Sequence, residues 1–232
     1  MVKEFVYLKK ISIFYILSFL VFIFSILFFI KNVDNVKHDF NDVTEVKVEV
    51  LKNKNCNPII NHKGGKQLSH NDVKITVNNV ISKFNNLKSF DKDNLSALII
   101  ETMIVETLVG KSKYDYASKN YRNYGIVQLR EDTVEWMLSK LERKDIDTYA
   151  EIMSFYNYDK SLRENLLTNV QFGIASCVQY YYLRNKNLNE NIKTTAARSN
   201  QWKKNYNTSK GLGTEKIYQD RVNDYYTKYI IY

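Results

Sequence analysis

Histidine and cysteine are scarce in this chain, and their positions exclude several kinds of catalysis. Three of the 232 residues are histidines, at His38, His62 and His70, so none follows residue 70. Ser-His-Asp and Cys-His sites therefore cannot be assembled from the C-terminal two-thirds alone. Only Cys56 and Cys177 are cysteines, which argues against a His/Cys zinc site in that part. Chemistry there must come from carboxylates, hydroxyls, amides and tyrosines.

Proline and glycine are also rare, which excludes the collagen-like and proline-rich disordered classes. The chain has one proline and seven glycines, whereas 44% of its residues are hydrophobic, enough for a folded core. Lysine and arginine outnumber aspartate and glutamate by 34 to 25, giving a net charge of +9. This charge favours an acidic partner such as an anionic lipid or a cell-wall polymer. The basic residues are scattered, so we expect no nucleic-acid partner.

One long hydrophobic run, ISIFYILSFLVFIFSILFFI, covers residues 11–30 and contains no charge. A helix of that length rises about 30 Å, which matches the hydrocarbon core of a bilayer. A cleavable secretory signal is the alternative, but the run is long for a signal and no small-x-small cleavage site follows it. Lys3, Lys9 and Lys10 precede the run, so the positive-inside rule places the amino terminus in the cytoplasm. The remainder is then periplasmic or extracellular.

The chain divides into four predicted parts: a cytoplasmic tail (1–10), a transmembrane anchor (11–30), a polar tether (31–70) and a helical domain (71–232). Within the tether, TEVKVEV (44–50) alternates apolar and charged residues, which is the period of a short strand. An external compartment permits disulfides. A Cys56–Cys177 bridge and a buried Cys177 thiol therefore both stay open.

From residue 71 onward, apolar residues recur with the period of α-helices. Predicted helices begin at Asn71 or Asp72, at Asp91 or Asn94 (ending at Gly110), around 134–141, and over 146–157, 161–186, 190–205 and 215–230. The long polar loop SKYDYASKNYRNYG follows the second of them. The predicted fold class is all-α, with a single core in a domain of about 160 residues.

Two glutamates, Glu101 and Glu106, interrupt the apolar helix LSALIIETMIVETLVG. A carboxylate held against apolar neighbours has a raised pKa, which the general acid of a glycosidase needs. The two residues are five apart, so they do not share a helix face. We expect one of them to face a cleft and the other to face solvent. The alternative is that both are exposed on an amphipathic helix.

A series of motifs over residues 85–232 resembles the soluble lytic transglycosylase family of lysozyme-like, peptidoglycan-cleaving enzymes. The motifs are, in order, Glu106-Thr107, Ser118, Gly125-Ile126-Val127-Gln128, Thr133, Asn169 with Gly173, Tyr182-Leu183, Tyr206-Asn207, and Tyr218 with Arg221-Val222. The short gap between the last two is most similar to the branch that serves secretion and conjugation machines. The order of the motifs carries the resemblance, since Gly-x-x-Gln alone is unspecific.

The chain departs from the family pattern at several positions. Thr107 stands in place of the usual serine and keeps the hydroxyl. The loop between Glu106 and Gln128 is a few residues longer than usual. Ser209 occupies the place of the usual glycine after Tyr-Asn, with Gly211 close by.

The resemblance implies a specific reaction and a set of site residues. Glu106 would protonate the glycosidic oxygen between N-acetylmuramic acid and N-acetylglucosamine, then take a proton from the muramoyl C6 hydroxyl. That hydroxyl attacks C1 of the same sugar and yields a 1,6-anhydro product, so a tethered nucleophile replaces a second carboxylate and an activated water. Gln128, Tyr206, Ser118 and Asn207 would bind the substrate, with Tyr206 orienting Glu106 or the sugar.

The resemblance also implies partners and a location. The substrate would be the glycan strands of peptidoglycan, and we expect neither a metal nor another cofactor. The protein would span the inner membrane once, with its lysozyme-like helical domain in the periplasm, and would join a secretion or other envelope-spanning complex.

Two other functions stay open. A lysozyme-type hydrolase of the same fold would need an aspartate to activate water, and Asp115 and Asp132 are the nearest in sequence. A non-catalytic wall-binding component of an envelope-spanning machine would keep the fold without the chemistry. The presence of Glu106 argues against this last reading.

Overall fold

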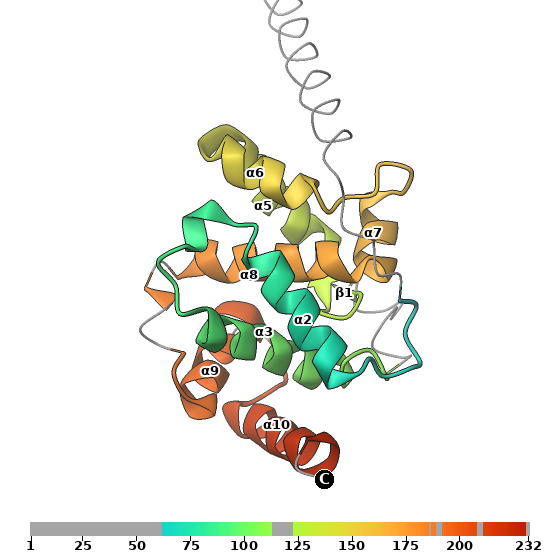
Figure 1. Ribbon diagram of the computed structural model, residues 1–232, viewed down its shortest axis with the longest axis vertical. Coiled ribbons are helices and arrows are strands. Elements are labelled where there is room, and N and C mark those ends of the chain that lie inside the picture. Colours follow the sequence, from blue (N-terminus) through green and yellow to red (C-terminus); the bar gives the residue numbers. More distant parts are fainter. Residues whose placement is uncertain (1–61, 113–122, 186, 189–191, 208–210, 231–232) are drawn as a thin grey trace, which may run out of the picture. The chain divides into compact units, whose positions relative to one another are not determined.

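Helices make up most of the described chain, which confirms the prediction of a mostly α-helical protein (Figure 1). The computed structural model describes residues 62–112, 123–185, 187–188, 192–207 and 211–230. They all belong to one unit, Lys54–Tyr232. The expected anchor at 11–30 and the expected strand at 44–50 lie outside the described residues. Within those residues, no helix combines the length and apolar character needed to cross a bilayer.

The elements follow one another closely along the chain. They are α2 (His70–Ile81), the 3₁₀ turn η1 (Asn85–Leu87), α3 (Lys92–Thr107), β1 (Asn123–Tyr124), β2 (Leu129–Arg130), α5 (Glu131–Lys144), α6 (Ile146–Met153), α7 (Leu162–Thr168), α8 (Val170–Arg184), α9 (Thr195–Gln201), the π-helical segment η3 (Trp202–Asn207) and α10 (Glu215–Tyr229). Side-chain oxygens of Ser69, Asp91 and Thr214 accept backbone N–H bonds at the starts of α2, α3 and α10. These caps satisfy N–H groups that have no partner within the helix.

The predicted single helix over 161–186 is wrong, because Asn169 separates α7 from α8. The Asn169 backbone is extended, and its side-chain oxygen accepts a hydrogen bond from Phe172 N at 3.1 Å. Its amide also donates to the Phe155 carbonyl at 2.7 Å. A buried asparagine with both ends bonded caps α8 and ends the preceding helix. The point at which α8 begins is therefore set by this one side chain.

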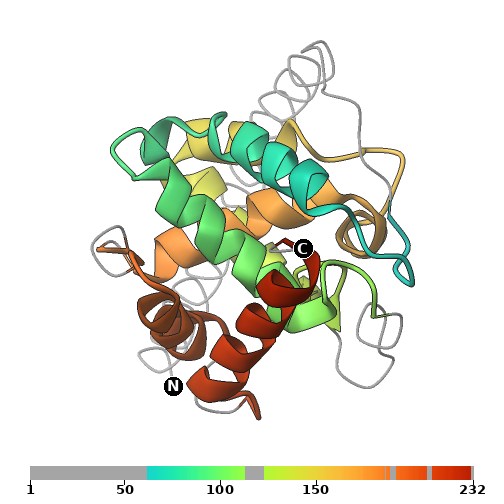
Figure 2. The same ribbon diagram turned by 60° about the horizontal axis from the view of Figure 1, so that its bottom comes forward.

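Helix α8 is central in the described unit, where α2, α3, α5, α6 and α7 all contact it (Figure 1). Helix α3 packs against α2, α8 and α10, and the last of these runs beside it in Figure 2. Leu98, Ile99, Met103 and Ile104 of α3 have no exposed surface. Neighbours on several sides explain why α3 is apolar around most of its circumference rather than along one stripe.

A buried ion pair joins three helices. Glu101 of α3 is completely buried, and Arg198 of α9 donates to both of its oxygens, from Nε at 2.8 Å and from Nη2 at 2.6 Å. Tyr218 of α10 donates its hydroxyl to Glu101 Oε2 at 3.0 Å. The expectation that one of the two glutamates faces solvent is wrong for Glu101. Its bidentate contact with the Arg198 guanidinium allows the carboxylate to be buried. Burial raises the pKa of Tyr218 well above its ordinary value, so its hydroxyl remains a donor.

Replacing Glu101 by Gln should destabilise the protein by about 3–5 kcal/mol, because Arg198 would keep a buried charge without its counter-ion. The matched control is Asp220→Asn, which breaks the exposed Lys216–Asp220 pair of 2.9 Å on α10 and should cost less than about 1 kcal/mol. Urea unfolding of both variants measures the difference. Similar losses of unfolding free energy in the two variants would mean that the buried pair contributes no more to stability than the exposed pair.

Candidate active site

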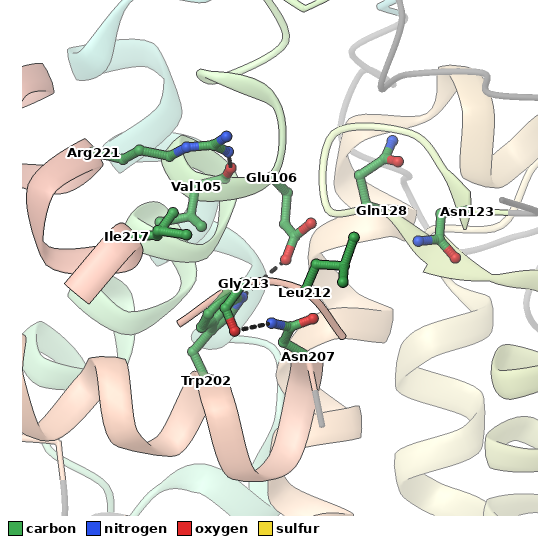
Figure 3. Close-up of a pocket in the computed structure, with 10 residues that line it drawn as sticks. All are labelled: Val105, Glu106, Asn123, Gln128, Trp202, Asn207, Leu212, Gly213, Ile217 and Arg221. Carbon is green, nitrogen blue, oxygen red and sulfur yellow. Dashed lines mark hydrogen bonds between the residues drawn. The ribbon is translucent and has the colours of Figure 1, made fainter. Parts of the chain in front are cut away.

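Glu106 lines an open hollow of about 390 Å³ on the surface of the described unit (Figure 3). The lining side chains come from α3, the β1–β2 hairpin, η3, the following segment and α10. They are Val105, Glu106, Asn123, Gln128, Trp202, Asn207, Leu212, Gly213, Ile217 and Arg221. Glu106 is the one carboxylate among them. The hollow thus brings together three of the predicted site residues, Glu106, Gln128 and Asn207.

The indole of Trp202 holds the Glu106 carboxylate. Trp202 Nε1 donates to Glu106 Oε1 at 2.9 Å (Figure 3). The Trp202 ring also packs on Tyr218, with centroids 5.4 Å apart. An indole N–H can only donate, so it fixes the orientation of the acceptor. The motifs did not single out Trp202. Tryptophan is a rare residue type in this chain, and Trp202 stands four positions before Tyr206, where a helix would place it on the same face.

Thr107 connects the end of α3 to the hairpin that carries Gln128. Its hydroxyl donates to the Ile126 carbonyl at 2.9 Å and accepts a hydrogen bond from Gly110 N at 3.0 Å. The hydroxyl of Thr107 therefore connects the end of α3 to the backbone of the hairpin. Because Thr107 directly follows Glu106, this contact fixes the position of Glu106 relative to the hairpin.

The hairpin is a feature that the sequence pattern did not predict. β1 and β2 are antiparallel, with Tyr124 opposite Leu129, and the turn between them contains Gly125 at φ +73° and Gln128 at φ +53°. Gln128 donates from its side-chain Nε2 to the Gly125 carbonyl at 2.8 Å. The side-chain nitrogen of Gln128 therefore donates within the turn. The side-chain oxygen of Gln128 can accept a hydrogen bond from a ligand.

Tyr206 supports the same turn, and the charge of Glu106 is near enough to act on its hydroxyl. Its hydroxyl donates to the Val127 carbonyl, and its ring stacks on Tyr181 at a centroid distance of 5.1 Å and an angle of 21°. Burial raises the pKa of Tyr206 well above its ordinary value, so the hydroxyl stays protonated and able to donate. Tyr206 thus bonds Val127, the residue before Gln128, and it is not among the residues that line the hollow.

Asn207 and two glycines shape the other wall of the hollow. Asn207 Nδ2 donates to the Gly213 carbonyl at 2.9 Å. A Cβ on Gly211 would lie 1.7 Å from Asn207 Oδ1, and one on Gly213 would lie 2.4 Å from the Trp202 ring. Gly211 and Gly213 are therefore required by close approach to these two side chains. Between them, Leu212 is 93% exposed at the mouth of the hollow.

The remaining candidates are not among the described residues that line this hollow. Ser118 and Asp115 are outside the described residues. Asp132 bonds Arg130 on the exposed surface, which holds its pKa below the usual range and leaves it outside this hollow. Cys177 is a buried free thiol, while Cys56 is outside the described part. Among the described residues, no group of three His, Cys, Asp or Glu side chains is placed to hold a metal ion.

The described lining of the hollow offers one carboxylate, several amides and a cation to a ligand. Such a set suits hydrogen bonding to hydroxyl and acetamido groups, with a single group able to exchange a proton. Comparisons of the chain with protein-family models, curated proteins and solved structures found no match. Any functional conclusion therefore rests on the residues of the site and on the motifs.

Gly125→Ala should destabilise the protein by about 3 kcal/mol, because Gly125 has a positive φ and a Cβ there would lie 1.8 Å from the Leu166 carbonyl oxygen. Gly173→Ala is the matched control. Its Cβ would meet Val127 at an ordinary 3.6 Å within a helix, so stability should be unchanged or raised by up to about 1 kcal/mol. Urea unfolding again provides the measurement. Tolerance of Gly125→Ala would show that the hairpin is not held against α7.

Proposed function

We propose that this chain is a membrane-anchored peptidoglycan lytic transglycosylase. It would cleave the β-1,4 bond between N-acetylmuramic acid and N-acetylglucosamine and release 1,6-anhydro-muropeptides. The observation that carries the proposal is Glu106: among the described residues it is the one carboxylate that lines the hollow, the Trp202 indole donates to it, and Gln128 and Asn207 line the same hollow. The motif order from Glu106 to Val222 agrees with this reading.

In the proposed reaction Glu106 acts twice. As an acid it gives its proton to the glycosidic oxygen while the bond from that oxygen to C1 breaks. As a base it then accepts the proton of the muramoyl C6 hydroxyl, whose oxygen bonds to C1. The carboxyl group ends as it began, and no water is consumed. A nucleophile tethered within the substrate makes a second carboxylate unnecessary, which suits a hollow whose described lining has one acid.

The other residues would position rather than react. Trp202 Nε1 donates to one oxygen of Glu106 and would hold the carboxyl group in a defined orientation towards the sugar. The Gln128 oxygen and the Asn207 amide would bond hydroxyl and acetamido groups. Tyr206 would act through the turn that precedes Gln128. Ser118 keeps its predicted role in binding.

The proposal includes a location and a finer fold assignment. Residues 11–30 would anchor the chain in the inner membrane, with the tail 1–10 in the cytoplasm and a lysozyme-like helical domain in the periplasm. The net charge of +9 favours attachment to an anionic wall. Cleavage would then take place close to the membrane, where an envelope-spanning complex such as a secretion machine needs an opening.

A lysozyme-type hydrolase is the second candidate, and one observation favours it. Asp224 lines an adjoining hollow that Glu106 also lines. An exposed aspartate near the acid could activate a water molecule, which would replace the C6 hydroxyl as nucleophile. A wall-binding component without catalysis is the third.

The decisive test is the mass of the products. Full-length protein in detergent micelles is incubated with purified peptidoglycan, and released muropeptides are weighed by mass spectrometry. Anhydro products are expected, and Glu106→Gln should lower their rate of release about 100- to 10,000-fold, because the proton donor is lost. Glu135→Gln is the matched control, since Glu135 is exposed on α5 and outside the hollow; it should leave the rate unchanged.

Other products would change the conclusion. Muropeptides heavier by one water would make the protein a hydrolase, and Asp224→Asn should then abolish their release. A folded protein that binds the wall and releases nothing would be a binding component.

Trp202→Phe tests the positioning of Glu106. Phenylalanine keeps the packing on Tyr218 but removes the N–H that bonds the carboxylate, so kcat should fall about 10- to 100-fold with little change in KM. Trp136→Phe is the matched control, because Trp136 is exposed on α5 and lies outside the hollow. Equal rates for the two variants would remove Trp202 from the catalytic account.

A further inference from the structure

A second hollow, of about 670 Å³, adjoins the first. Glu106 and Arg221 line both, so the two spaces meet at the proposed acid. The Arg221 guanidinium is fixed at this junction, where it donates to the Val105 carbonyl (Figure 3). A substrate held at Glu106 would therefore extend into the second hollow.

The second hollow differs from the first in its charges. It is lined by three cations, Lys111, Arg221 and Lys228, and by Asp224 in addition to Glu106. Lys111, Arg221, Asp224 and Lys228 are all exposed, and no ion pair joins them among the described residues. Charged groups that are not consumed by one another are available to a ligand of mixed charge. A ligand that carries charges of both signs would make fuller use of them than an uncharged sugar.

Apolar surface accompanies these charges. Leu108 is 40% exposed and Tyr229 is 39% exposed, and both line the second hollow. Exposed apolar side chains beside separated cations are suited to a short peptide that has small apolar side chains and several carboxylates. The peptide stem that muramic acid carries has this chemistry: it has free carboxylates, an amine and alanine methyl groups.

We infer that the second hollow binds the peptide stem of the muramic acid whose bond is cleaved, and that this makes the protein selective for peptide-bearing strands over peptide-free ones. The inference rests on the proposed function for its substrate. Lys111 and Lys228 bind stem carboxylates, and Asp224 faces the stem amine. The cleft then has a sugar-binding part next to Gln128 and a peptide-binding part next to α10.

Measurements of binding and of cleavage test separately whether the second hollow binds the peptide stem. Calorimetry with the full-length protein in detergent compares the disaccharide-tetrapeptide with the same disaccharide freed of its peptide. The stem-bearing ligand should bind about 10-fold more tightly, and the preference should shrink as salt rises. A Lys111→Gln/Lys228→Gln double variant should lose it. The control is Lys74→Gln/Lys83→Gln, which removes two exposed lysines that line neither hollow and should preserve the preference.

Digestion of intact and amidase-treated, peptide-free strands completes the test. The double variant should cleave intact strands about 5- to 10-fold more slowly and peptide-free strands at the unchanged rate. Equal binding of both ligands by the wild type, or a preference that survives in the double variant, would overturn the inference even if anhydro products appear. A wild type that cleaves neither strand but binds the stem through these lysines would refute the proposed function and leave the peptide site standing.

Discussion

The ion pair between Glu101 and Arg198 is the contact on which the cleft depends. It holds α3 against α9, and the Tyr218 hydroxyl adds α10 to the same carboxylate. Glu106 follows Glu101 by five residues within α3, and Trp202, the first residue of η3, follows Arg198 of α9 by four, so each lies a little more than one helical turn further along the chain. The Trp202–Glu106 hydrogen bond is therefore a second contact between the same two parts of the chain. A buried charge pair restricts how these parts can pack, and that restriction extends to the partly buried Trp202–Glu106 pair.

The opposite wall of the cleft is set by polar side chains that bond backbone. Thr107 bonds Ile126, Tyr206 bonds Val127, and Asn169 fixes the start of α8 beneath the hairpin. Each of these residues belongs to a motif of the resemblance, and each is used here to place the turn that ends at Gln128. The motifs of the resemblance thus contain residues that support the turn as well as residues that line the hollow, and the two kinds are distinguished by where their hydrogen bonds go.

The proposed chemistry makes modest demands, which this site meets with few groups. A reaction whose nucleophile is already part of the substrate needs one proton-exchanging residue and a defined sugar position. The scarcity of histidine is no obstacle to it. Specificity then depends on what surrounds the acid, and the two hollows differ in that respect: amides gather on the Gln128 side, whereas separated charges gather towards α10.

Much of the helical framework was determined by the sequence itself. Apolar periodicity and capping residues such as Asp91 predicted most of the helices, and the order of the motifs singled out Glu106 together with Gln128 and Asn207. These signals are local, so they can be read along the chain. The tertiary structure alone decided that Glu101 is buried, that Asn169 divides a helix, and that Trp202 bonds a glutamate 96 residues away. Such contacts depend on how distant elements pack, and neither periodicity nor motif order carries information about the partner that a buried charge or an indole N–H will find.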